Sequence, residues 1–284
     1  MPHDQHVAVL GLGIIGNIWT ENWLSDGVSV KAWNRTPKPA CPVWSDDLIA
    51  TVQDADVICM VLSDGPVTKH ILETILPHLR PNAIVAQHAT IAVAETKALA
   101  QLVQGSGRRY VDMPFTGSKP AAEDRQTVFF VGDDDDTLPR IKDLYASLCQ
   151  VSIPIGQVGD AAGIKLAMNL NIAGTYQAMA ESFALTRAIG IPDETYWHVL
   201  GLNISKSGLA DLKKLKMING DWSPQFSVKH LHKDLSLALE VARDVDRHLP
   251  QTERLQQSYT ERLAGGDGDL DFGALLKLVD PSSA

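Results

Sequence analysis

The sequence predicts an α/β fold: a doubly wound parallel sheet, followed by an all-α domain that a long interdomain helix joins to it. Three observations carry this prediction. Short apolar runs alternate with helical segments up to about residue 155, a glycine-rich hexapeptide follows the first run, and strand patterns are almost absent after Ile164. Alternating strands and helices form βαβ units, whose right-handed crossovers place helices on both faces of a parallel sheet.

The first part of the chain supplies the predicted sheet. Val57–Leu62 is a continuous apolar run, as expected for a strand that is buried on both faces. Met113–Pro120 contains proline and glycine at a spacing that predicts a loop. We expect strands at 7–10, 28–33, 57–62, 83–87, 110–113, 127–131 and 151–155, and helices at 14–24, 48–52, 67–79, 93–103 and 138–148.

The second part of the chain is predicted to be helical. Ile164–Ile189 has helical character throughout, and Gly190-Ile191-Pro192 ends it. Further helices are expected at 194–202, 209–218, 228–245 and 252–263. The change of pattern divides the chain into a sheet domain over residues 1–159 and a helical domain over residues 160–284, which we expect to bind substrate and to form the oligomer.

Composition excludes several classes of protein. The formal net charge of −9 over 284 residues argues against a nucleic-acid surface, which needs clustered Lys and Arg. No run of about 18 apolar residues predicts a membrane span, and the polar residues before the first strand do not resemble a secretory signal. Three widely spaced cysteines form no disulfide framework, and no His, Cys or carboxylate group has metal-ligand spacing, so we expect no metal. These features predict a cytoplasmic protein.

The glycine-rich hexapeptide has the spacing G-x-G-x-x-G and predicts a dinucleotide site. It follows a strand directly and opens a helix, which is the context of the Rossmann fingerprint. Gly11 allows the tight turn, Gly13 lets the backbone approach a pyrophosphate, and Gly16 lets helix and strand pack closely. The helix N-terminus offers N–H groups to the phosphates. The predicted cofactor-binding residues of this loop are Gly11, Leu12, Gly13, Ile14, Ile15 and Gly16.

The end of the second strand indicates which dinucleotide is bound. An NAD site usually has Asp or Glu here, because the carboxylate holds the ribose 2′-hydroxyl. This chain has Asn34, Arg35 and Thr36 instead. Arg35 can pair with a 2′-phosphate through its planar fork, and Asn34 and Thr36 can donate neutral hydrogen bonds. The sequence therefore predicts NADP(H) as the cofactor.

With these segments, the chain resembles the β-hydroxyacid dehydrogenase family, which includes 3-hydroxyisobutyrate dehydrogenase and the glyoxylate/succinic semialdehyde reductases. Besides the two cofactor motifs, the similar segments are Asp112–Ser118, Gly159–Asn169 and Phe226–Asp234. The residue pattern of the segment that begins at Gly117 favours the glyoxylate/succinic semialdehyde reductase branch. The resemblance implies hydride transfer between NADPH and a small aldehyde or β-hydroxy acid.

Lys165 and Asn169 are the expected catalytic residues. They are four residues apart on the long predicted helix, so they share a face. A lysine in the apolar stretch AGIKLAM is costly without a partner or a function, and desolvation suits it to proton transfer near neutral pH. The resemblance implies that Lys165 is the general acid and base and that Asn169 orients Lys165 or the substrate.

The resemblance also implies the remaining site residues. The substrate carboxylate is expected at Thr116, Gly117 and Ser118, while Phe226 and Asp234 are expected to line the substrate pocket. Further cofactor contacts are expected from Leu62, Ser63, Thr90 and Lys233. Two positions depart from the family pattern: Thr116 stands where serine is usual, and Arg125 stands where a glycine is frequent.

Two alternatives stay open. An imine reductase has the same architecture and NADPH preference, and a non-catalytic NADP-binding module has the same fold. Both are expected to lack the counterpart of Lys165, which is present here. The apolar helical domain and the resemblance both favour a homodimer or homotetramer. We expect the ligand to be a small substrate that carries a carboxylate. We expect neither nucleic acid nor a membrane as a partner.

Overall fold

The computed structural model describes residues 5–280, and the chain divides into two compact units. Unit 1 ends at Lys165 and unit 2 begins at Leu166. The strands of unit 1 are β1 (His6–Leu10), β2 (Ser29–Trp33), β3 (Trp44–Ser45), β4 (Val57–Met60), β5 (Ile84–Gln87), β6 (Arg109–Asp112), β7 (Phe115–Thr116), β8 (Thr127–Gly132) and β9 (Cys149–Gly156). Its helices are α1 (Ile14–Ser25), α2 (Leu48–Val52), α3 (Gly65–Ile75), the 3-10 helix η2 (Leu76–His78), α4 (Val93–Gly105), α5 (Ser118–Glu123) and α6 (Leu138–Ala146).

The sheet of unit 1 has the strand order β3-β2-β1-β4-β5-β6-β8-β7, with β9 paired to β8. The strands from β3 to β6 are parallel, as predicted. Beyond β6 the direction changes, because β8 is antiparallel to both β6 and β7, whereas β9 is parallel to β8. A two-residue strand such as β7 carries no periodic pattern, so its direction follows only from its pairing with β8.

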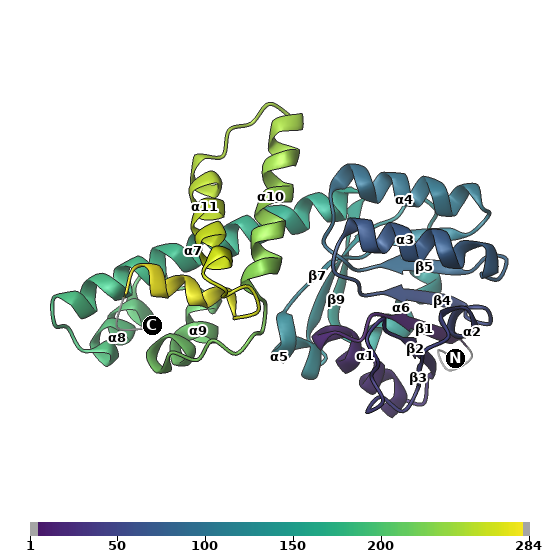
Figure 1. The fold of residues 1–284 in the computed structure, drawn as a ribbon, viewed down its shortest axis with the longest axis horizontal. Coiled ribbons are helices and arrows are strands. Elements are labelled where there is room, and N and C mark those ends of the chain that lie inside the picture. Colours follow the sequence, from purple (N-terminus) through teal and green to yellow (C-terminus); the bar gives the residue numbers. More distant parts are fainter. Residues whose placement is uncertain (1–4, 281–284) are drawn as a thin grey trace. The chain divides into compact units, whose positions relative to one another are not determined.

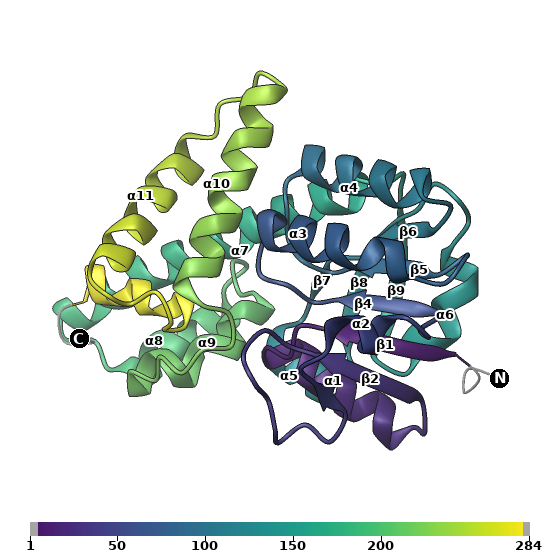
Figure 2. The same ribbon diagram turned by 45° about the vertical axis from the view of Figure 1, so that its right-hand side comes forward.

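Helices cover both faces of this sheet, as Figure 2 shows. Trp19 and Trp23 of α1 and Leu144 of α6 pack on one face. The other face is covered by α2, α3 and α4, through apolar residues such as Leu72 and Val103. Because both faces are covered, β4 and β5 are fully buried, which explains why β4 is a continuous apolar run and β5 is apolar up to its last residue, Gln87.

The segment predicted as a loop at Met113–Pro120 contains β7 and the start of α5. The strand predicted to end at Leu62 ends at Met60, and β3 was not predicted. These differences are confined to elements of a few residues, whose periodicity is too short to detect.

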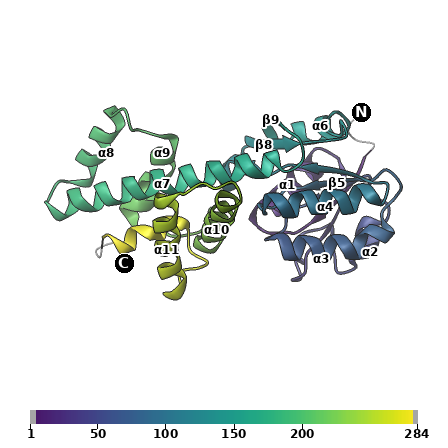
Figure 3. The same cartoon turned by 90° about the horizontal axis from the view of Figure 1, so that it is seen from above.

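Unit 2 is all-α, as predicted. Helix α7 (Asp160–Ala188) crosses the boundary between the units and is the longest helix in Figures 1 and 3. The other helices are α8 (Asp193–Leu202), α9 (Gly208–Asn219), α10 (Val228–Asp244), α11 (Pro250–Ala264) and the 3-10 helix η3 (Phe272–Leu278). Aromatic residues such as Tyr176, Phe183 and Tyr259 fill its core. No helix in residues 5–280 is long and apolar enough to span a membrane.

Candidate active site

The three glycines of the loop after β1 have different surroundings. Gly11 has φ +105°, and a Cβ added there would lie 2.2 Å from the carbonyl oxygen of Val61. A Cβ added at Gly16 would lie 1.9 Å from the carbonyl oxygen of Gly11. A Cβ added at Gly13 would meet no protein atom within 4 Å. Gly11 and Gly16 are therefore required by the fold itself, whereas the smallness of Gly13 leaves open space beside the backbone.

Asn34 holds this loop to the end of β2. Its Oδ1 accepts a hydrogen bond from the Leu12 N–H at 2.9 Å, and its Nδ2 donates to the Thr36 carbonyl at 2.7 Å. Arg35 and Thr36 are exposed. Each end of the Asn34 amide thus has one partner within the protein, and Arg35 and Thr36 beside it are exposed.

Helix α1 differs from α3 and α4 at its N-terminus. Asp64 caps α3 by accepting from the Val67 N–H at 2.9 Å, and Glu95 lies in the first turn of α4, where it accepts from the Ala92 N–H at 3.3 Å. Helix α1 begins after Gly13 with no side-chain cap and no acidic residue in its first turn. Its N–H groups and positive helix end are therefore open to an anion such as a pyrophosphate, which the carboxylates at the other two helices would repel.

Three further predicted cofactor residues follow neighbouring strands of the same sheet. Leu62 and Ser63 come after β4, and Thr90 comes after β5. Leu62 and Thr90 are half-buried, and the Ser63 hydroxyl donates to Asp64 at 2.6 Å. Since β1, β4 and β5 are parallel, these residues share the carboxyl edge of the sheet with the glycine loop.

The predicted substrate residues Thr116, Gly117 and Ser118 form the turn from β7 into α5. Gly117 has φ +124°, and a Cβ added there would lie 2.5 Å from the Cβ of Ala121. Ser118 has φ +48°. The turn therefore depends on glycine at residue 117, and its backbone N–H groups stand at the start of α5.

Asp112 anchors the first turn of α7, a role that the sequence did not suggest. Its carboxylate accepts from the N–H groups of Ala162 at 2.9 Å and Gly159 at 3.3 Å. Burial raises the pKa of Asp112 to about 7, against the lowering effect of those two hydrogen bonds, and the nearby Asp160 raises it further. Because Asp112 ends β6, this contact connects the sheet to the helix that carries Lys165.

Asn169 is buried, and its side chain is hydrogen-bonded to a residue that is distant in the sequence. Lys165 is half-buried one turn earlier on α7. The Asn169 Nδ2 donates to Asp234 Oδ2 on α10 at 2.6 Å, and the Asn169 Oδ1 has no hydrogen-bond partner among residues 5–280. Asp234 is 2% exposed, and its Oδ1 lies 2.8 Å from the Lys233 Nζ. A carboxylate therefore fixes which end of the Asn169 amide donates and which end remains an acceptor.

The segment that carries Phe226 is held by a buried ion pair. The Lys213 Nζ lies 2.7 Å from Asp271 Oδ1, and both side chains are 1% exposed. The other Asp271 oxygen accepts from the Gln225 N–H at 3.0 Å, immediately before Phe226. Phe226 itself is half-buried and stacks on His230. Sequence periodicity did not reveal this pair, because its partners are 58 residues apart.

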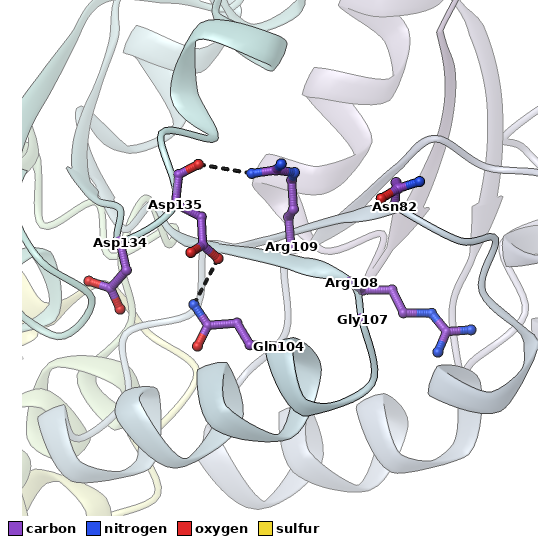
Figure 4. A pocket seen from close by; sticks show the side chains of 7 residues that line it. All are labelled: Asn82, Gln104, Gly107, Arg108, Arg109, Asp134 and Asp135. Atoms are coloured by element: carbon purple, nitrogen blue, oxygen red, sulfur yellow. Dashed lines mark hydrogen bonds between the residues drawn. The ribbon is translucent and has the colours of Figure 1, made fainter.

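A separate pocket of about 550 Å³ contains none of the predicted site residues. It is lined by Asn82, Gln104, Gly107, Arg108, Arg109, Asp134 and Asp135. Figure 4 shows Arg109 and Gln104 directed toward Asp135, with Arg108 pointing away from it. Arg108 donates to two backbone carbonyls, those of Ser106 and Leu79, at 2.7 Å. The charged groups of this pocket are thus engaged with each other or with the backbone.

Comparison with known proteins agrees with this geometry. The model of the NAD binding domain of 6-phosphogluconate dehydrogenase matches residues 6–156. A second model, described as the NAD-binding of NADP-dependent 3-hydroxyisobutyrate dehydrogenase, matches residues 159–279. Together the two matches extend over both units.

Among individual proteins, the chain is 26% identical over 284 residues to glyoxylate/succinic semialdehyde reductase 1 of Arabidopsis thaliana. The aligned region covers 97% of this chain and 98% of that relative. It is 25% identical over 280 residues to the cytokine-like nuclear factor N-PAC of Mus musculus, covering 97% of this chain but 51% of the relative. The chain thus spans about half the length of that relative.

The fold is also that of a solved structure, Mycobacterium tuberculosis 3-hydroxyisobutyrate dehydrogenase with L-serine. The TM-score is 0.86 at 24% identity, with 96% of this chain and 98% of the other covered. The resemblance seen in the sequence motifs is thereby confirmed. The chain belongs to the β-hydroxyacid dehydrogenase family.

Proposed function

We propose that this protein is an NADPH-dependent reductase of small aldehydes that carry a carboxylate, such as glyoxylate or succinic semialdehyde. In the opposite direction it would oxidise a β-hydroxy acid, as a 3-hydroxyisobutyrate-type dehydrogenase does. The observation that carries the proposal is the buried Asn169, which Asp234 fixes one helical turn beyond Lys165. A buried amide with one unpartnered acceptor is costly to maintain, and it is therefore expected to serve a ligand or a catalytic group.

The cofactor proposal rests on three features of unit 1. The N-terminus of α1 has no carboxylate cap, Gly13 has open space beside it, and Arg35 is exposed at the end of β2. Pyrophosphate would bind at α1, and the 2′-phosphate of NADP(H) would pair with Arg35 and the Thr36 hydroxyl. Leu62, Ser63, Thr90 and Lys233 are the proposed contacts with the rest of the cofactor.

Lys165 is the proposed proton donor. Bound NADPH would supply a hydride to the carbonyl carbon of the substrate, and the carbonyl oxygen would then need one proton. The Lys165 ammonium gives one proton to that oxygen, so the aldehyde becomes an alcohol and the lysine becomes neutral. In the oxidative direction Lys165 takes the proton back. The Asn169 Oδ1 would orient the Lys165 ammonium or the substrate hydroxyl.

The substrate carboxylate is proposed to bind at the turn of Thr116, Gly117 and Ser118. Backbone N–H groups and two hydroxyls can donate there to an anion. Phe226 and Asp234 would line the rest of the pocket. A carboxylate at one end and a reducible carbonyl a short distance away define the substrate class.

A panel of carboxylated aldehydes, each assayed with NADPH and with NADH, tests this proposal. We expect glyoxylate or succinic semialdehyde to be reduced, with NADPH strongly preferred. Arg35→Ala should weaken NADPH binding by up to about 2–3 kcal/mol, because a charge-assisted hydrogen bond is lost. NADH binding should change little. Equal rates with the two cofactors in the wild-type protein would contradict the role of Arg35.

A second candidate is a non-catalytic NADP-binding module, because the relative N-PAC has the name of a cytokine-like nuclear factor and not that of an enzyme. The presence of Lys165 argues against it, and against an imine reductase as well. Isothermal titration with NADPH separates the two classes: tight binding without turnover of any aldehyde would favour the module.

We also propose that the protein forms a homodimer or homotetramer and acts in the cytoplasm. Unit 2 exposes several large apolar side chains, namely Leu185, Ile189, Val199, Leu202, Ile204, Leu212 and Leu215. Large apolar side chains that are exposed in one chain become buried where chains associate. Light scattering after gel filtration should give a mass of at least two chains.

A further inference from the structure

Arg125 adopts a backbone conformation that favours glycine, and its side chain makes a dense set of contacts. Its φ is +59°, in the left-handed region. The guanidinium bonds to Asp26 Oδ2 at 2.6 Å, the Ser25 hydroxyl at 2.9 Å and the Ser147 carbonyl at 3.0 Å. Asp26 raises the pKa of Arg125, as expected for a close ion pair. A strained residue that is held this firmly indicates a constraint on the surrounding segment.

Those contacts connect two segments with different proposed roles. Arg125 follows α5, the helix that begins in the Thr116–Ser118 turn. Asp26 and Ser25 end α1, the helix that begins in the glycine loop. A second bond joins the same helices, since the Asn22 Nδ2 donates to the Ala122 carbonyl at 3.0 Å. The far end of α5 is thus fixed to α1 at two points.

The turn is bounded by two short elements, and on its β7 side Thr116 is paired with Val128 of β8. It lies between the two-residue strand β7 and the six-residue helix α5, and both Ser118 and Arg125 have positive φ. The Gln126 N–H donates to the Ala121 carbonyl at 2.7 Å and closes the helix before β8. A short helix is stable only through its tertiary contacts, so the position of the turn depends on what holds α5.

We propose that Arg125 is a positioning residue that fixes the carboxylate-binding turn Thr116–Ser118 by tying α5 to the C-terminal end of α1. This inference rests on the proposed function, because it takes that turn as the substrate-binding element. Binding of a carboxylate by backbone N–H groups requires these groups to be held in place before the substrate arrives. Arg125 therefore acts on substrate affinity without touching the substrate.

Three variants of Arg125 separate its guanidinium from its backbone. Arg125→Gly and Arg125→Asn both accept a positive φ, so they remove the contacts without adding backbone strain. Arg125→Lys keeps the charge. The matched control is Asp56→Asn, which weakens the Arg80–Asp56 ion pair, also 2.6 Å long and in unit 1, but away from α5.

Two measurements apply to each variant: steady-state kinetics with the best carboxylated aldehyde, and amide hydrogen exchange of residues 117–124. Arg125→Gly and Arg125→Asn should raise KM at least fivefold, change kcat less than twofold, and speed exchange in that segment. Arg125→Lys should recover much of the loss, and Asp56→Asn should change neither quantity. NADPH affinity should stay the same in all variants.

Unchanged KM and exchange in Arg125→Gly would overturn the inference, as would equal effects from Asp56→Asn. If the wild-type protein reduces no carboxylated aldehyde, the proposed function fails. The exchange comparison needs no turnover, and it would still decide whether Arg125 holds the turn.

Discussion

The residues proposed for binding and catalysis are of different kinds in the two units. Unit 1 offers two backbone elements, the open N-terminus of α1 and the turn at Gly117, beside the side chains of Arg35 and Lys165. Unit 2 offers side chains that other side chains hold, as Asp234 holds Asn169. A backbone site depends on whether a Cβ fits, whereas a side-chain site depends on its partners. Substitutions in unit 1 should therefore impair binding mainly when they add a Cβ, and those in unit 2 when they remove a hydrogen-bond partner.

The units also bury ionisable groups differently. In unit 1, burial lowers the pKa of His88 to about 4 and raises that of Asp112 to about 7, so both shifts favour the neutral form. In unit 2, the buried Lys213 and Asp271 lie 2.7 Å apart as an ion pair. The stability of unit 1 should therefore respond to pH through His88 and Asp112, whereas loss of Lys213 or Asp271 should leave an unpaired buried charge in unit 2.

The largest expected effect comes from Lys165, the last residue of unit 1. Lys165→Ala should lower kcat by about 10²–10⁴-fold, because a positioned proton donor contributes an effect of that size. NADPH binding, followed by fluorescence titration, should be retained, since Lys165 is not proposed to hold the cofactor. Retained turnover would refute its role as the proton donor.

The glycine loop offers a paired test of the backbone site. Gly16→Ala should destabilise the protein by about 3 kcal/mol, because its Cβ would overlap the Gly11 carbonyl and force the loop apart. Gly13→Ala should leave the free energy of unfolding nearly unchanged but weaken NADPH binding, since its Cβ enters only the open space. Urea denaturation and cofactor titration of both variants check this. A Gly13→Ala protein that binds NADPH normally would contradict the cofactor site.

Acid should destabilise unit 1 through His88, which bonds to the Met113 carbonyl at 2.7 Å and the Tyr145 hydroxyl at 2.8 Å. The unfolded chain binds the His88 proton below about pH 6.5, but the folded chain only below about pH 4. Between these values the wild type should lose about 3 kcal/mol relative to His88→Gln. Asp112 has the opposite sign, because its raised pKa adds stability as pH falls below 7.

Urea melts from pH 7 to pH 4 measure both effects. The difference in unfolding free energy between wild type and His88→Gln should shrink as pH falls, whereas the advantage of the wild type over Asp112→Asn should grow. A pH-independent difference in the first pair would mean that His88 is not buried in its neutral form.

The smallest effect is expected at Asp234. Asp234→Ala removes the acceptor for the Asn169 amide and should lower kcat about tenfold, which corresponds to about 1.4 kcal/mol. Asp234→Asn keeps an acceptor oxygen and should retain more activity. If the two variants behave alike in steady-state kinetics, Asp234 does not act by orienting Asn169.

Much of the fold was predictable because its signals are local. The apolar runs at β1, β4 and β5 and the helices α1, α4 and α7 all follow from periodicity. The direction of β8 and the existence of β3 and β7 were missed, since they depend on pairing between distant segments. The start of α7 at Asp160 also depends on a distant residue, Asp112.

The sequence by itself determined the glycine loop, the absence of an acidic residue after β2 and the change from strands to helices. These are contiguous patterns, and each reflects a backbone requirement or a local apolar period. Only the tertiary structure decided which side chains form hydrogen bonds and ion pairs with one another. Asn34 is used within the protein, Asp234 orients Asn169 across 65 residues of chain, and Arg125 fastens α5 to α1. Such partners are chosen by packing in three dimensions, which leaves no periodic trace in the sequence.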